Sequence, residues 1–155
     1  MKKETESELD SLLNEDSRRV AEIKIRSDKT QAEAEALSRR WNKIGAEIIR
    51  PVMQEIGTKL KLHGHNYDTE IDVGSITMWV DFAGRRAYKH SHSNDYAPRI
   101  SFFQGGDEVL IKARSDQTLG SSPFDNYTYK LDELTKDIVE EKVLEFIRKS
   151  LSATT

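Results

Sequence analysis

The sequence predicts an α+β fold in which two helices cover one face of an antiparallel sheet. Two observations carry this prediction. Between residues 37 and 62 apolar side chains recur every three or four positions, which is typical of one buried side of a helix: Leu37, Trp41, Ile44, Ile48, Val52, Ile56 and Leu60. After Gly64 the apolar period changes to two, which is typical of half-buried strands. We therefore expect a sheet that needs a helical cover.

The N-terminal half continues the helical pattern as a heptad repeat. We define the seam as its two apolar positions, occupied by Leu9, Asp16, Ile23, Thr30, Leu37 and Ile44 and by Leu13, Val20, Ser27, Ala34, Trp41 and Ile48. Nine of these twelve residues are apolar, which favours one long helix that packs along a partner helix. Three are polar, so a bend near residues 27–30 that gives a helical hairpin is the alternative. We assign residues 1–36 to a helical extension, a candidate coiled coil, and residues 37–155 to an α+β domain.

Proline and glycine punctuate the central helix. Pro51 removes one helical hydrogen bond and crowds the preceding turn, so we expect a kink or a fresh helix start near this residue. Gly64 stands where a C-terminal cap would end the helix. The long helix is therefore predicted to bend near Pro51 and to stop before residue 64.

The remaining elements form a meander of four or five strands and a last helix. Alternation and turn residues predict strands at 67–73, 76–82, 99–104, 108–114 and, as a short fifth strand, 127–131. An amphipathic helix is expected from about Thr135, a plausible N-cap, to Leu151. Its apolar face, with Val139, Val143, Phe146, Ile147 and Leu151, should pack on the same sheet face as the first helix.

Composition excludes several classes of protein. The chain has 155 residues, no cysteine and a net charge of −3, with 33% charged residues. Disulfides and cysteine-based zinc sites are excluded, and a protein that mainly coats nucleic acid is disfavoured. There is no signal-peptide pattern and no apolar run of membrane-spanning length, so we expect a cytoplasmic protein that does not bind membranes.

All four histidines fall in two His-x-His pairs, His63 with His65 and His90 with His92. On an extended backbone residues i and i+2 point the same way, so each pair could offer two imidazoles to Zn²⁺, the one cofactor that the sequence suggests. The alternative is ordinary: His63 lies at a helix C-terminus, where a histidine is electrostatically favoured, and the other pair lies in a polar loop. A metal-binding protein or hydrolase is therefore one alternative function.

The most basic stretch runs from residue 85 to residue 92. Arg85, Arg86, Tyr88 and Lys89 combine positive charge with an aromatic ring, as a phosphate or single-stranded nucleic-acid contact would. The same charges are also expected on an edge strand or loop that must resist aggregation. A phosphate-binding or nucleic-acid-binding domain is therefore the second alternative.

Apolar residues also occur on the second face of the predicted sheet. Trp79 alternates out of phase with Met78 and Val80, and Phe103 follows Phe102 directly. Such residues indicate either a covered face or a binding patch. No nucleophile elbow, phosphate-binding loop, His-Glu-x-x-His or EF-hand motif is present.

We therefore predict a non-enzymatic interaction or oligomerisation module. It would associate with itself or with a partner protein through the helix and through the sheet face, with Val20, Ile23, Leu37, Trp41, Trp79 and Phe103 as contact residues. The order of long helix, sheet and helix occurs in proteins of unrelated roles, so the architecture alone indicates no function.

Overall fold

The computed structural model describes residues 2–84, 98–115 and 125–152. The contacts within the chain divide it into two compact units, Met1–Leu37 and Ser38–Thr155, which are described separately below. We refer to them as unit 1 and unit 2.

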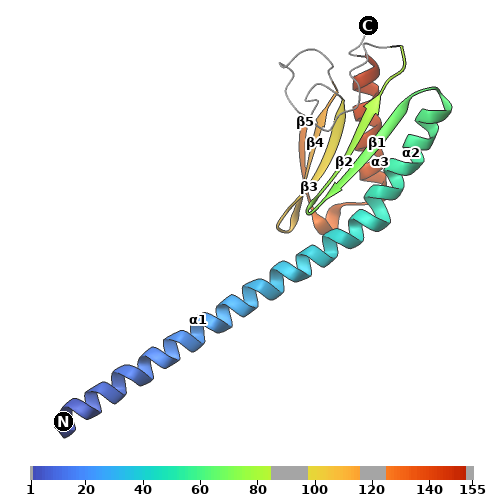
Figure 1. The fold of residues 1–155 in the computed structure, drawn as a ribbon. Coiled ribbons are helices and arrows are strands. Elements are labelled where there is room, and N and C mark those ends of the chain that lie inside the picture. The colour runs from blue at the N-terminus through green and yellow to red at the C-terminus, as the bar shows by residue number, and fades with distance from the viewer. Residues whose placement is uncertain (1, 85–97, 116–124, 153–155) are drawn as a thin grey trace. The chain divides into compact units, whose positions relative to one another are not determined.

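The elements confirm the predicted α+β class, with a long N-terminal helix, an antiparallel sheet and a C-terminal helix (Figure 1). In chain order they are α1 (Lys3–Ile44), the π-helical segment η1 (Gly45–Ile49), α2 (Arg50–Leu62), β1 (Asn66–Asp72), β2 (Ser75–Asp81), β3 (Arg99–Gly105), β4 (Glu108–Arg114), β5 (Asp125–Lys130), the 3₁₀ turn η2 (Leu131–Glu133) and α3 (Lys136–Ser152).

Unit 1 consists of the larger part of α1. The helix runs without a break through residues 27–30, so the hairpin alternative is wrong. The Thr30 hydroxyl donates to the carbonyl oxygen of Arg26 at 2.9 Å, which satisfies this polar group within the helix.

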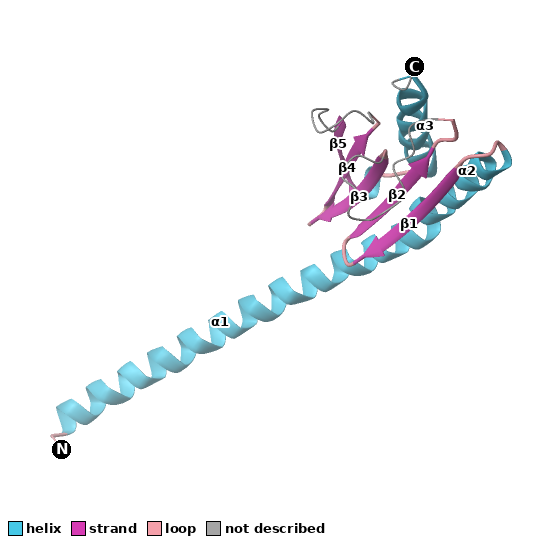
Figure 2. Cartoon of the chain, turned by 45° about the horizontal axis from the view of Figure 1, so that its top comes forward, coloured by secondary structure: helices cyan, strands magenta, loops and turns pink. Residues whose placement is uncertain are grey.

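Unit 2 contains the sheet, in which the five strands follow one another in the order β1-β2-β3-β4-β5 and every pair is antiparallel (Figure 2). The β3–β4 hairpin closes with Gly106 at a φ of 62°, a backbone conformation that favours glycine. The register places Tyr67, Met78, Ile100, Ile111 and Tyr127 on one face, in line with the alternation of the sequence.

Both α2 and α3 pack on this first face. The Tyr67 ring lies against Gly57 of α2, and the Tyr127 hydroxyl donates to Glu145 of α3 at 2.8 Å. Between the helices and the sheet lies a core of fully buried side chains, which includes Ile49, Met53, Met78, Val80, Phe82, Ile100, Phe102, Ile111, Val139, Val143 and Phe146.

The irregularity expected near Pro51 lies one turn earlier. Arg50 donates its N–H to Gly45, five residues back, so the chain passes through a π turn before α2 begins with Pro51 in its first turn. Proline has no N–H and crowds the preceding turn, and a wider turn relieves that crowding. The extra residue also shifts the buried stripe: Gly45 and Ile49 are buried, whereas Ile44 and Ile48 are only half-buried.

The helix ends follow the sequence closely. Gly64, at a φ of 87°, donates to Lys61, and His65 donates to Leu60, each at 3.0 Å. These two bonds form a Schellman motif, which ends α2 at the predicted glycine. Thr135 caps α3, because its hydroxyl accepts the N–H of Ile138 at 3.3 Å.

The fifth strand differs from the prediction of 127–131. It covers Asp125–Lys130, and Leu131 begins the 3₁₀ turn. The Leu131 side chain is buried, and its N–H donates to Asp107 in the β3–β4 hairpin at 2.8 Å. Leu131 therefore contributes its apolar side chain to the core from a turn, not from a strand.

Candidate functional site

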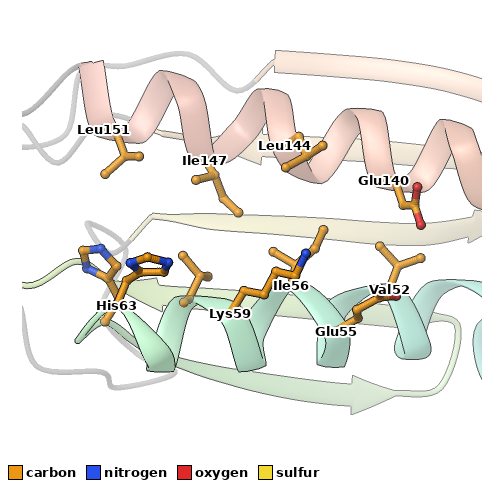
Figure 3. A pocket seen from close by; sticks show the side chains of 11 residues that line it. Val52, Glu55, Ile56, Lys59, His63, Glu140, Leu144, Ile147 and Leu151 are labelled. Carbon is orange, nitrogen blue, oxygen red and sulfur yellow. The ribbon is translucent and has the colours of Figure 1, made fainter.

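A groove of about 430 Å³ lies between α2 and α3 in unit 2 (Figure 3). The two helices run in the same direction along it. Its walls are mostly apolar, and they are formed by Val52, Glu55, Ile56, Lys59, Leu60, His63, His65, Glu140, Leu144, Ile147 and Leu151. Leu144 is 50% exposed and Leu151 is 38% exposed, so the α3 wall presents apolar area to solvent.

Charged groups are distributed unevenly along the groove. Figure 3 shows Glu55 and Glu140 toward the end where the helices begin, His63 toward the end where they finish, and Lys59 between them. Glu140 also pairs with Lys136 of its own helix at 3.7 Å. Within the described part of the chain, neither Glu55 nor Lys59 forms a side-chain ion pair. The groove therefore carries an acidic end and a basic centre.

His63 and His65 both reach this groove, but they are held differently. His63 is the C-cap of α2. The Nδ1 atom of His65 accepts the N–H of Ala83 at 2.9 Å, and its ring meets the Phe82 ring edge-on, with centroids 5.5 Å apart. This hydrogen bond occupies one of the two nitrogens that a metal could use.

Within the described residues, no third metal ligand joins His63 and His65. Among the residues that the structure describes, no group of three or more His, Cys, Asp or Glu could hold a metal ion. His90 and His92 lie outside the described residues, as do Arg85, Arg86, Tyr88 and Lys89 of the basic stretch.

A second polar cluster joins β5 to α3. Glu145 accepts from Tyr127 at 2.8 Å and pairs with Lys142 at 3.4 Å and Lys149 at 3.3 Å, and Lys149 also pairs with Asp125 at 2.9 Å. The Lys142 ammonium lies 3.7 Å from the centroid of the Tyr127 ring. The cluster attaches the edge strand β5 to α3, the helix that forms one wall of the groove.

The cluster shifts the pKa values of its members in the directions its contacts require. The hydrogen bond from Tyr127, together with the two lysines, lowers the pKa of Glu145 despite its partial burial. Burial and the same bond raise the pKa of Tyr127. The hydrogen bond to Asp125 raises the pKa of Lys149. All three groups therefore stay in the protonation states that the cluster needs.

The second sheet face holds the two predicted aromatic contacts. Trp79 is only 6% exposed, with the Arg99 guanidinium 5.1 Å from its ring centroid. Phe103 is half-buried, and the Lys112 ammonium lies 5.9 Å from its centroid. Trp79 is thus largely covered, and Phe103 is the more accessible of the two.

The predicted helical contacts divide between the two units. In unit 1, Leu9, Leu12, Leu13, Val20, Ile23 and Ile25 are 43–67% exposed, and Leu37 is half-buried. Trp41 belongs to unit 2 and is buried in its core. Val20 and Ile23 therefore present apolar side chains to solvent, whereas Trp41 is part of the core of unit 2.

The sequence did not reveal the groove, nor the role of Lys59 and Glu55 in it. Leu144 is the residue that could have indicated the groove, because it is an apolar residue of α3 outside the face assigned to the core.

No protein-family model, no curated protein sequence and no solved structure matches this chain. Within the described residues, no helix combines the length and the apolar character that a membrane crossing requires.

Proposed function

We propose that the chain is a non-enzymatic self-association module whose contact surface is the seam of α1. The observation that carries the proposal is the exposure of six large apolar residues along one helix, from Leu9 to Ile25. Four of them, Leu9, Leu13, Val20 and Ile23, lie on the heptad seam, which is the pattern of a helix that packs along a partner.

Physical chemistry supports a partner for this segment. The seam buries little within its own helix, and helices in water gain most of their stability from packing an amphipathic face. Ion pairs such as Arg19 with Glu15, at 3.9 Å on the exposed surface, add only a few tenths of a kcal/mol each. Burial of the seam against another helix would supply the stabilisation that the isolated helix lacks.

The experiment compares Ile23→Asp with Ile25→Asp in the full chain. The two isoleucines are 59% and 67% exposed and lie in the same helix, but Ile23 is on the seam and Ile25 on the opposite side. Solution mass by light scattering should show an oligomer for the wild type and for Ile25→Asp, and a monomer for Ile23→Asp.

The expected loss of affinity in Ile23→Asp follows from the exposed fraction of the Ile23 side chain. Full burial of an isoleucine stabilises by about 1.5–3 kcal/mol, so covering the 59% that is exposed contributes roughly 1–2 kcal/mol in each copy. A dimer that loses two such contacts should dissociate roughly 30- to 1,000-fold more readily. A wild-type chain that is monomeric at its highest soluble concentration would falsify self-association and leave a partner protein as the occupant of the seam.

A further inference from the structure

We propose that the groove between α2 and α3 receives the N-terminal part of α1 from a second copy, antiparallel to both groove helices. This inference rests on the proposed self-association and names the surface that the seam contacts. In a reciprocal dimer each copy would donate one helix and offer one groove.

The charge pattern of α1 favours the antiparallel orientation. Residues 3–16 of α1 are mainly acidic, with Glu4, Glu6, Glu8, Asp10, Glu15 and Asp16 against Lys3, and residues 17–26 are mainly basic, with Arg18, Arg19, Lys24 and Arg26 against Glu22. An antiparallel helix places its acidic part near the end of the groove with the histidines and its basic part near Glu55 and Glu140.

One register pairs the charged residues of both surfaces. If Asp16 lies opposite Lys59, then Ile23, seven residues later, lies opposite Val52, seven residues earlier. Arg19 then comes close to Glu55. Helical rise is the same on both helices, about 1.5 Å per residue, so these pairs stay aligned over the whole contact.

This register gives a reason for two otherwise unexplained charges. Asp16 interrupts the apolar seam, and Lys59 interrupts the apolar groove. Within the described residues neither takes part in a side-chain ion pair of its own copy. Together they form an ion pair at the centre of the contact, where desolvation strengthens the attraction between them.

The first test places a charge in the groove. Leu144→Glu changes a half-exposed groove residue, and Leu62→Glu is its matched control, because Leu62 is 80% exposed on α2 and does not line the groove. By light scattering of the full chain, Leu144→Glu should be monomeric and Leu62→Glu should keep the wild-type mass. Far-UV circular dichroism checks that both variants keep the fold.

Mixing two defective chains then separates the groove from pairing between two α1 helices. Ile23→Asp has an intact groove and a damaged helix, and Leu144→Glu has the reverse. Neither can form an intact interface alone, but a mixture forms one per dimer, so its mass should rise toward that of a dimer. Helix-to-helix pairing of α1 predicts no recovery on mixing.

A charge reversal tests the register. Asp16→Lys and Lys59→Asp should each weaken association at least about tenfold, and the double variant should restore it, as expected for directly coupled residues. Failure of the double variant to recover would overturn the pairing of Asp16 with Lys59.

The outcomes distinguish the two proposals. If Leu144→Glu keeps the wild-type mass while Ile23→Asp is monomeric, self-association stands and the groove is overturned as its site. If Leu144→Glu is monomeric but mixing with Ile23→Asp gives no recovery, the groove is likewise overturned. If Ile23→Asp keeps the wild-type mass, both proposals fall.

Discussion

Replacement of Gly57 by alanine tests how α2 is held against the sheet. Glycine inside a helix is normally unfavourable, and alanine should stabilise an ordinary helix position by about 0.8–1.0 kcal/mol. At Gly57 an added Cβ would meet three ring carbons of Tyr67 at distances that packed side chains do not reach. We therefore expect alanine at this position to destabilise unit 2.

The magnitude follows from the two opposing effects. Overpacking a core site typically costs about 1–3 kcal/mol, and displacement of a whole ring belongs at the upper end of that range. After subtraction of the helical gain, Gly57→Ala should lower the free energy of unfolding by about 2 kcal/mol. In a Tyr67→Ala background the ring is absent, so Gly57→Ala should raise the free energy of unfolding by about 1 kcal/mol. The coupling between the two sites is then about 3 kcal/mol.

Urea unfolding of the four proteins measures this coupling. Gly45→Ala is the control, because its Cβ would meet only the terminal methyl of Ile76, at 2.9 Å, which can shift; we expect a change below about 1 kcal/mol. If Gly57→Ala is more stable than the wild type while Tyr67 is present, the close packing of ring and helix is refuted. The position of α2, which forms one wall of the groove, would then have to depend on contacts other than this one.

Two further predictions concern α3. Thr135→Ala removes the N-cap and should cost about 1 kcal/mol in urea unfolding, whereas Thr135→Ser, which keeps the hydroxyl, should cost much less. The folded-state pKa of Glu145 lies below its ordinary value of 4.5, so its stabilising effect is complete above that pH and is lost as the pH falls through the folded-state value. Glu145→Gln should be less stable at pH 7, and its stability should fall less steeply than that of the wild type below pH 4.5; equal slopes would show that Glu145 does not contribute.

The regular elements were predictable because local chemistry decides them. Gly64 and Thr135 end and begin helices by hydrogen bonds to the nearest turn, and the β4 alternation places Val109 and Ile111 in the core. These signals lie within a few residues of the feature that they predict. The sequence therefore identified the helices, four strands, the approximate place of the fifth strand and the α+β class.

The groove was not predictable because it depends on how two distant helices approach each other. The π turn before Pro51 rotates α2 relative to a regular helix, so Ile49 rather than Ile48 is buried. Which residues of α2 face α3 depends on that rotation, and periodicity alone does not include it. Lys59 and Glu55 could thus be read as ordinary solvated charges until the helices were seen side by side.

Asp16 separates the two ways in which α1 could associate. In a parallel, in-register pair of α1 helices, the two Asp16 side chains would face each other on the seam, and like charges there oppose association. Asp16→Leu should then tighten the dimer about 100-fold or more, since each leucine would add about 1.5–3 kcal/mol of burial. In the groove, Asp16 faces Lys59, and leucine would exchange an ion pair for a contact with a charged neighbour, so no such gain is expected. Sedimentation equilibrium of this single variant distinguishes the two: a much tighter dimer contradicts the groove, and an unchanged or weaker dimer contradicts the parallel pair.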